Sequence, residues 1–203
     1  YCLNSAFEKN FNKYNFHSLY KELLNFCTSD LSAFYFDIRK DTLYCDPLEN
    51  KKRISTIKFL NIVLDILLKW LAPVLSFTTE EIYSLLKIDE KGSIHLEKFP
   101  AIPSNWNNID LNNKWTELIK IRNKCNRSIE LKRASKEIGS SLEANLTILL
   151  NDKLIELSKG TNFSELCITS GAKIDKINEN GPEEIVIKTA KAEGKKCPVC
   201  WKI

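Results

Sequence analysis

The spacing of apolar residues changes near residue 138, and this change restricts the chain to two kinds of structure joined in series. Before that point, apolar side chains recur every three or four residues, as on the buried face of a helix. After it, short apolar runs alternate with segments rich in glycine and lysine, as in a small sheet with a few helices. We therefore expect a mainly α chain, with a helical bundle over residues 1–138 and a small α/β (α+β) unit over residues 139–194.

The longest helix of the first part is expected over residues 52–71. Its apolar residues are dense enough to be buried on more than one side, and Pro73 ends it. Thr78 and Glu81 then have the spacing of a capping box, in which each side chain binds the other's backbone N–H. This pattern predicts the start of a further helix over residues 79–86.

Shorter helices are expected on the N-terminal side of this long one. The apolar spacing predicts helices over residues 7–14 and 17–27. Asp30 is a typical cap for the next helix, whose apolar stripe brings Arg39 and Lys40 to its C-terminal end. The expected result is a succession of helices in the first part of the chain.

A second long helix, expected over residues 113–136, has one apolar and one basic face. It follows a segment over residues 89–113 whose glycine, prolines and asparagines predict a loop. The inward positions of the helix are Trp115, Leu118, Cys125 and Ile129, and its outward cations are Lys120, Lys124 and Arg127.

Positive charge is concentrated in the second half of the chain. Residues 1–100 carry 13 Lys and Arg against 13 Asp and Glu, so the formal excess of +4 lies in residues 101–203. Residues 114–136 hold eight basic and two acidic residues, and residues 191–203 hold four basic and one acidic. Such stretches suit a phosphate backbone, although a solvated helix face is the commoner explanation of any single lysine.

Residues 195–203 contain half of a metal site. Cys197 and Cys200 have the CxxC spacing that holds one edge of a tetrahedral zinc ion, and a structural site needs four ligands. We therefore expect the chain to be part of a longer protein and to bind zinc only weakly by itself. A redox CxxC pair is the lesser alternative, since no βαβ pattern precedes it.

The remaining composition indicates an ordinary globular chain. The other five cysteines are scattered through apolar surroundings, which favours a reducing compartment, and we expect the cytoplasm. The longest apolar run, over residues 62–75, contains two charged residues and a proline and does not predict a membrane span.

Five segments, in their order along the chain, resemble the C-terminal region of bacterial isoleucyl-tRNA synthetases. They are NFCTSDLSAFYFDIRKDTLYCD, WLAPVLSFTTEEIYSLL, KEIGSSLEA, LCITSGAKI and AEGKKCPVCW. The first two are similar to the anticodon-binding bundle shared by the class I synthetases for isoleucine, valine and leucine. The last three, above all the Cys-Trp ending, point to the bacterial isoleucine enzymes. The resemblance covers essentially the whole chain.

The resemblance implies a region of an enzyme that is inactive without the rest. The HIGH and KMSKS motifs of the catalytic domain, which would use ATP and Mg, and the editing domain are absent from this sequence. The implied partner is the anticodon stem-loop of tRNA(Ile), with no DNA and no membrane, and the full-length enzyme is expected to be a monomer. The resemblance also implies that residues 195–203 begin a zinc finger whose second CxxC is absent here.

Two departures from the family pattern reduce its basic residues. Thr42 stands where the family often has the arginine of a KDRLY motif, and Lys52 replaces the first of two arginines before the long helix. Lysine keeps the charge at the second position but loses the planar fork that binds phosphate in two places.

The candidate RNA-binding residues are cations near helix ends and one aromatic ring. Unpaired bases stack on aromatic or arginine planes, while lysine and arginine hold the backbone. Two basic groups are expected to meet across the loop over residues 41–50, the basic helix adds a weaker set, and the ring that follows the CxxC either stacks on a base or packs on the sheet. The candidates are Arg39, Lys40, Lys51, Lys52, Arg53, Lys120, Lys124, Arg127 and Trp201.

Two alternatives remain open. A free-standing helical interaction module without an RNA role would suit the balanced charge of residues 1–100. The equivalent bundle of a valine or leucine synthetase is the other, although the Cys-Trp ending argues against it.

Overall fold

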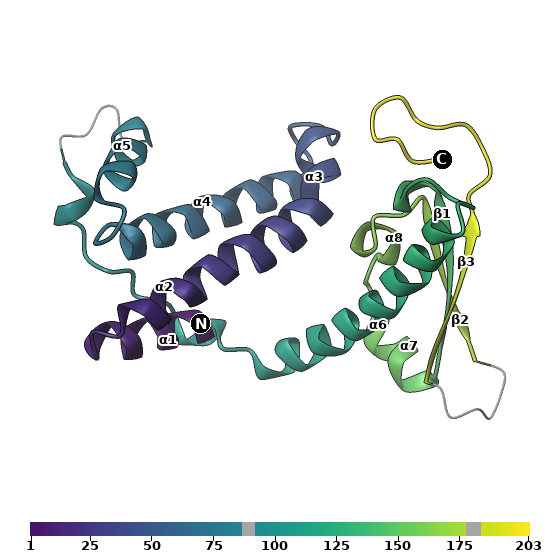
Figure 1. The fold of residues 1–203 in the computed structure, drawn as a ribbon, viewed down its shortest axis with the longest axis horizontal. Helices are drawn as coiled ribbons and strands as arrows, with labels where there is room; N and C mark the ends of the chain where they lie inside the picture. Colours follow the sequence, from purple (N-terminus) through teal and green to yellow (C-terminus); the bar gives the residue numbers. More distant parts are fainter. Residues whose placement is uncertain (87–91, 178–183) are drawn as a thin grey trace. The chain divides into compact units, whose positions relative to one another are not determined.

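The computed structural model of this chain describes residues 1–86, 92–177 and 184–203. It is mainly helical, with a small three-stranded sheet formed late in the sequence, which confirms the expected fold class in outline (Figure 1). None of the described helices has both the length and the apolar content that crossing a membrane requires.

The chain divides into two compact units. Unit 1 consists of residues 1–19 and 42–106, and unit 2 of residues 20–41 and 107–203. This division differs from the ranges 1–138, 139–194 and 195–203 expected from sequence, because the helix over residues 109–134 packs on the sheet.

Unit 1 is built around the long helix predicted from sequence. Its complete helices are α1 (Cys2–Asn12), α4 (Lys51–Leu71) and α5 (Ser76–Leu86), with short 3₁₀ turns at Ile94–Leu96 and Ser104–Trp106. Asn50 caps α4, because its side-chain oxygen accepts the N–H groups of Lys52 and Arg53 at 2.8 and 3.3 Å. The expectation that α4 is buried on more than one side is wrong for Ile54 and Ile57, which are 39% and 41% exposed.

Helix α5 starts earlier than its capping signal predicted. It begins at Ser76. At the start of this helix, the Thr79 hydroxyl donates a hydrogen bond to the Leu75 carbonyl at 3.0 Å. The capping box at Thr78 is therefore wrong, because the chain after Pro73 continues in a tight turn and enters the helix at once. Residues 89–91 of the predicted loop lie outside the described residues.

A single helical run replaces the two helices expected between residues 17 and 40. It consists of α2 (Phe16–Asn25), an 11-residue π-helix η1 (Phe26–Phe36) and α3 (Asp37–Tyr44). The predicted start at Asp30 is wrong, because Asp30 lies inside η1, in the middle of this continuous run. The neighbouring Thr28 hydroxyl bonds backward to the Leu24 carbonyl at 2.9 Å. The predicted end at Lys40 is also wrong, because α3 continues to Tyr44.

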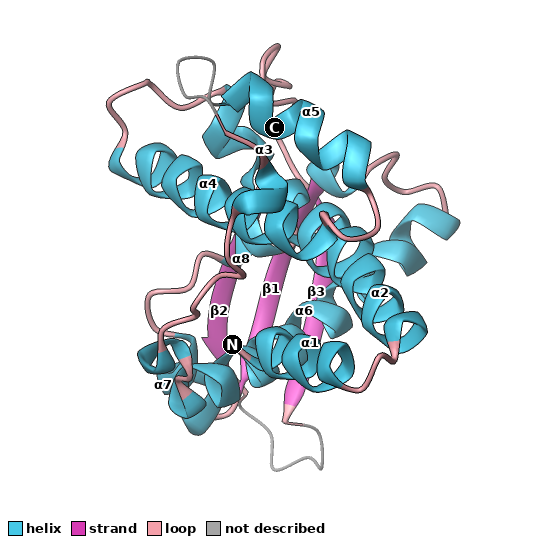
Figure 2. Cartoon of the chain, turned by 90° about the vertical axis from the view of Figure 1, so that its left-hand side faces the viewer, coloured by secondary structure: helices cyan, strands magenta, loops and turns pink. Residues whose placement is uncertain are grey.

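The sheet of unit 2 has the strand order β2-β1-β3 (Figure 2). Strand β1 (Ala144–Leu150) pairs parallel with β2 (Gly171–Lys176) and antiparallel with β3 (Ile185–Lys191). Helices α7 (Asp152–Ser158) and α8 (Phe163–Leu166) connect the parallel pair. Strand β3 ends at Lys191, and the segment over residues 192–203 that follows it contains no strand.

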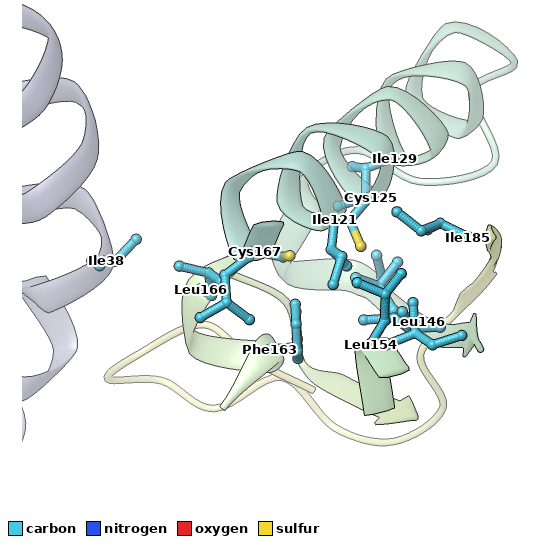
Figure 3. Packing of buried hydrophobic residues seen from close by; sticks show 14 of the residues in the cluster. Ile38, Ile121, Cys125, Ile129, Leu146, Leu154, Phe163, Leu166, Cys167 and Ile185 are labelled. Carbon is cyan, nitrogen blue, oxygen red and sulfur yellow. The ribbon is translucent and has the colours of Figure 1, made fainter. Parts of the chain in front are cut away.

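Helix α6 (Ile109–Ala134) covers the sheet and supplies one side of the largest core. Leu118, Ile121, Cys125 and Ile129 are at most 2% exposed and pack with apolar residues of β1 and α8 (Figure 3). Trp115 was expected inward but is 37% exposed, so the buried face begins at Leu118. A hydrogen bond with the Cys167 thiol, together with burial, raises the pKa of the Cys125 thiol, which keeps it protonated in the core.

Candidate nucleic-acid interface

The cations at the start of α4 in unit 1 are of two kinds. Lys51 and Lys52 are exposed in the first helical turn, where no acidic residue accompanies them. Positive charge at a helix N-terminus opposes the helix dipole, so the helix itself does not stabilise these two ammonium groups. Arg53 is half-buried and donates from Nη1 to the Asp46 carbonyl at 2.7 Å, which fastens the preceding turn.

Arg39 of unit 2 is held in an internal ion pair. Its Nη1 lies 2.5 Å from Oε1 of Glu165, and the two side chains are only 24% and 18% exposed. The guanidinium also lies 5.8 Å from the centroid of the Tyr35 ring. Arg39 therefore joins α3 to α8, and sequence reasoning did not predict this structural role.

Lys40 is less tightly held than Arg39. Its ammonium lies 3.5 Å from Asp37, and its side chain is 43% exposed. Arg39 and Lys40 belong to unit 2, whereas Lys51, Lys52 and Arg53 belong to unit 1. Their approach across the loop over residues 41–50 stays a prediction.

The three outward cations of α6 are exposed, as the helical spacing predicted. Lys120 pairs with Glu117 at 2.7 Å but keeps 61% of its side chain exposed. Lys124 donates to the Ile185 carbonyl at 3.2 Å, so part of its bonding capacity is used inside unit 2. Arg127 has no ionic or hydrogen-bonding side-chain partner within the described ranges, and it is the most available of the three.

The last residues of the chain fold back onto unit 2. The Ile203 N–H donates to the Ser170 hydroxyl at 2.7 Å, and the Lys202 ammonium lies 2.9 Å from the Asp41 carboxylate. Within the segment, the Cys197 N–H donates to the Lys202 carbonyl at 2.7 Å, and the Trp201 N–H donates to the Cys197 carbonyl at 3.0 Å. These bonds close residues 197–202 into a loop of defined shape.

The sulfur of Cys197 lies inside this loop's hydrogen-bonding pattern. The backbone N–H of Cys200, then that of Val199 and the Cys200 thiol, lower the pKa of the Cys197 thiol below its ordinary value. Backbone N–H groups directed at a sulfur stabilise a thiolate, which is the form that binds metal. In the part of the chain that the structure describes, no third His, Cys, Asp or Glu joins the pair, so these residues offer two of the four ligands of a closed zinc site.

Trp201 presents its ring to solvent. It is 60% exposed, and its backbone has a φ of 63°. The Lys196 ammonium lies 5.6 Å from the ring centroid, within cation–π distance. This exposure argues against packing of the ring on the sheet, and base stacking stays a prediction. Lys196 was missed as an individual residue, although the basic stretch over residues 191–203 contains it.

Comparison with known proteins assigns most of the chain to one family. The family model described as the anticodon-binding domain of tRNA ligase matches residues 3–148. The isoleucine–tRNA ligase of Pelagibacter ubique (strain HTCC1062) is 60% identical over 203 residues, which is 100% of this chain and 22% of that protein. The isoleucine–tRNA ligases of Agrobacterium fabrum and Brachyspira hyodysenteriae are 37% and 38% identical over 99% and 96% of the chain, and again over 22% of their own length.

The chain thus spans about a fifth of the length of these relatives. The family match begins in α1 and ends in β1, so it includes the start of α4 and the basic face of α6. The chain belongs to the family of anticodon-binding domains of tRNA ligases.

Proposed function

We propose that this chain is the anticodon-binding region of an isoleucine–tRNA ligase and that it binds the anticodon stem-loop of tRNA(Ile). The observation that carries this proposal is the 60% identity to a protein of that name over all 203 residues, including residues 149–203 beyond the family match. The ATP- and Mg-dependent attachment of isoleucine would take place in parts of the longer protein outside this chain. Its cytoplasmic location, its monomeric state and its lack of affinity for DNA stay predictions.

The proposed contacts divide into phosphate binding and base stacking. Lys40, Lys51 and Arg127 carry charge that their surroundings satisfy weakly, which suits a phosphate backbone, and Lys52, Lys120 and Lys124 supplement them. Arg39 and Arg53 remain candidates, but their guanidinium groups already bind internal oxygens. Trp201 is the candidate for base stacking, since a ring 60% exposed and bordered by a lysine suits an unpaired base.

Cys197 and Cys200 are proposed to hold one edge of a zinc ion. The lowered pKa of Cys197 and the N–H groups around its sulfur fit a thiolate ligand, and the remaining two ligands would come from outside this chain. Zinc would then fix the loop that carries Trp201. We expect this chain alone to bind zinc weakly, and stoichiometric zinc in the purified chain would contradict that expectation.

The proposal is tested by binding of two RNAs in a gel-shift assay at several salt concentrations. We expect tRNA(Ile) to bind more tightly than the same tRNA with an altered anticodon. Equal weak binding of both would contradict anticodon recognition, and no binding at low salt would favour an interaction module without an RNA role.

Variants assign the contribution of single cations. Arg127→Ala should reduce the slope of log affinity against log salt by about one, because one phosphate contact is lost. Lys173→Ala on β2 is the matched control, since Lys173 is 72% exposed and lies outside the candidate set. If both variants change the slope equally, the effect is one of net charge and Arg127 is not in the interface.

A further inference from the structure

Helix α1 ends in a turn that normally contains glycine, and here it contains a tyrosine. The Tyr14 N–H donates to the Phe11 carbonyl at 3.0 Å and the Asn15 N–H to the Asn10 carbonyl at 2.9 Å, which together form a Schellman motif. The motif requires a left-handed backbone at the residue that ends the helix, which is Tyr14 here, and Tyr14 has a φ of 55°. Left-handed backbone is unfavourable for a bulky residue, so the motif itself gives no reason for this side chain.

The Tyr14 ring is exposed but not loosely held. It is 80% exposed and meets the Phe16 ring edge-on, with centroids 6.0 Å apart. Phe16 in turn contacts Phe11, and Phe11 stacks on Phe7 at 5.5 Å. Phe7 stacks on Trp70, which is only 4% exposed. A line of rings within unit 1 therefore connects the exposed tyrosine to a buried anchor, which limits the ring motion that a bound ligand would have to arrest.

The charge near these rings is positive. Lys9 and Lys13 are exposed on the same helix end, and Lys98 is exposed beside Phe99, whose ring contacts Phe7 and Phe11. Among the residues that the structure describes, none forms an ion pair with these three lysines. The nearby Glu8 accepts a hydrogen bond from Asn4 at 2.9 Å. Exposed rings bordered by unpaired cations complement a base and its phosphates, whereas an apolar protein surface would leave the cations without partners.

We propose that Tyr14, supported by Phe16, is a stacking site for an unpaired base of the bound tRNA, with Lys9 and Lys13 on the adjoining phosphates. This site lies at the end of α1, an element that holds none of the candidates identified by sequence, and it rests on the proposed tRNA-binding function. The parallel with Trp201 supports it, because both are exposed rings with left-handed backbone next to a lysine.

The test replaces the tyrosine by the residue that the turn prefers. Tyr14→Gly removes the ring and relieves the backbone, so the melting temperature should stay the same or rise while affinity for tRNA(Ile) falls about 5- to 150-fold, the range for loss of one stacked base. Tyr14→Phe keeps the ring and should bind like the parent chain. Phe77→Ala is the matched control, since Phe77 is 93% exposed on α5, outside this line of rings, and its loss should not change affinity.

The outcomes separate this inference from the function on which it rests. If the parent chain binds no tRNA, the proposed function and the stacking site are both wrong. If the parent chain binds tRNA and Tyr14→Gly binds equally well, only the stacking site is wrong, and the same holds if Phe77→Ala loses as much affinity as Tyr14→Gly.

Discussion

The ion pair between Arg39 and Glu165 provides the sharpest test of how unit 2 is held together. With Nη1 and Oε1 2.5 Å apart, the charge centres lie about 4 Å apart, which corresponds to about 4 kcal/mol at an effective dielectric constant of about 20. Both side chains are about four-fifths buried, so lost hydration offsets much of this attraction. We expect a net coupling free energy of about 1 to 2 kcal/mol.

A double-mutant cycle measures this coupling directly. Arg39→Met keeps the aliphatic stem, and Glu165→Gln keeps the shape of the carboxylate. Each single variant should lower the free energy of unfolding by about 2 to 3 kcal/mol, because it leaves the other charge poorly solvated, and the double variant should lose less than the sum. Urea unfolding followed by circular dichroism gives these values, with the denaturant slope as a check that the unfolding transition is unchanged.

The same variants decide between the two roles of Arg39. If Arg39 serves the fold, Arg39→Met lowers stability and leaves the salt dependence of tRNA binding unchanged. A coupling below about 0.3 kcal/mol, accompanied by a loss of about one in the salt slope, would refute the structural reasoning and restore Arg39 to the RNA interface.

Three further predictions concern a cap, a thiol and the core. Asn50→Ala should cost about 1 kcal/mol of unfolding free energy by removing the cap of α4, and an unchanged urea midpoint would exclude that role. Cys197 should be alkylated by iodoacetamide at lower pH than Cys27, because hydrogen bonds lower the pKa of the Cys197 thiol and burial raises the pKa of the Cys27 thiol. Mass spectrometry of each site measures this order, and the opposite order would contradict the prediction. Ile148→Ala should cost about 3 kcal/mol, since this residue of β1 is 0% exposed, and a loss below about 1 kcal/mol would show that the core closes around the missing atoms.

Elements with strong periodicity were predicted well, whereas two helix starts that rested on capping signals were not. The long helices α4 and α6 and the strand β1 follow from runs of apolar residues whose spacing admits one structure. Helix starts at Asp30 and Thr78 were mispredicted because a cap is a short signal. The hydroxyls of the nearby Thr28 and Thr79 instead bond backward to carbonyls four residues earlier.

The candidate site was predicted by residue type more successfully than by role. Exposure of Lys120, Lys124 and Arg127 follows from their outward positions on α6, whose buried face was predicted. The ion pair of Arg39 joins residues 126 positions apart in sequence, and no local sequence pattern predicts such a partner. The exposed ring of Tyr14 was missed for a similar reason, since its rigidity comes from rings of α1, α4 and the start of α2 that meet only in the folded unit.

The sequence by itself determined that this chain forms helices followed by a small sheet, that its excess positive charge lies in the second half, and that it resembles one region of a tRNA synthetase. These properties are local or additive, because periodicity, composition and motif order need no contact between distant residues. Only the tertiary structure decided which cations are available to a ligand and which already bind other groups of the chain. Availability depends on what the fold brings within hydrogen-bonding distance, and that separates Arg127 from Arg39 although the two carry the same charge.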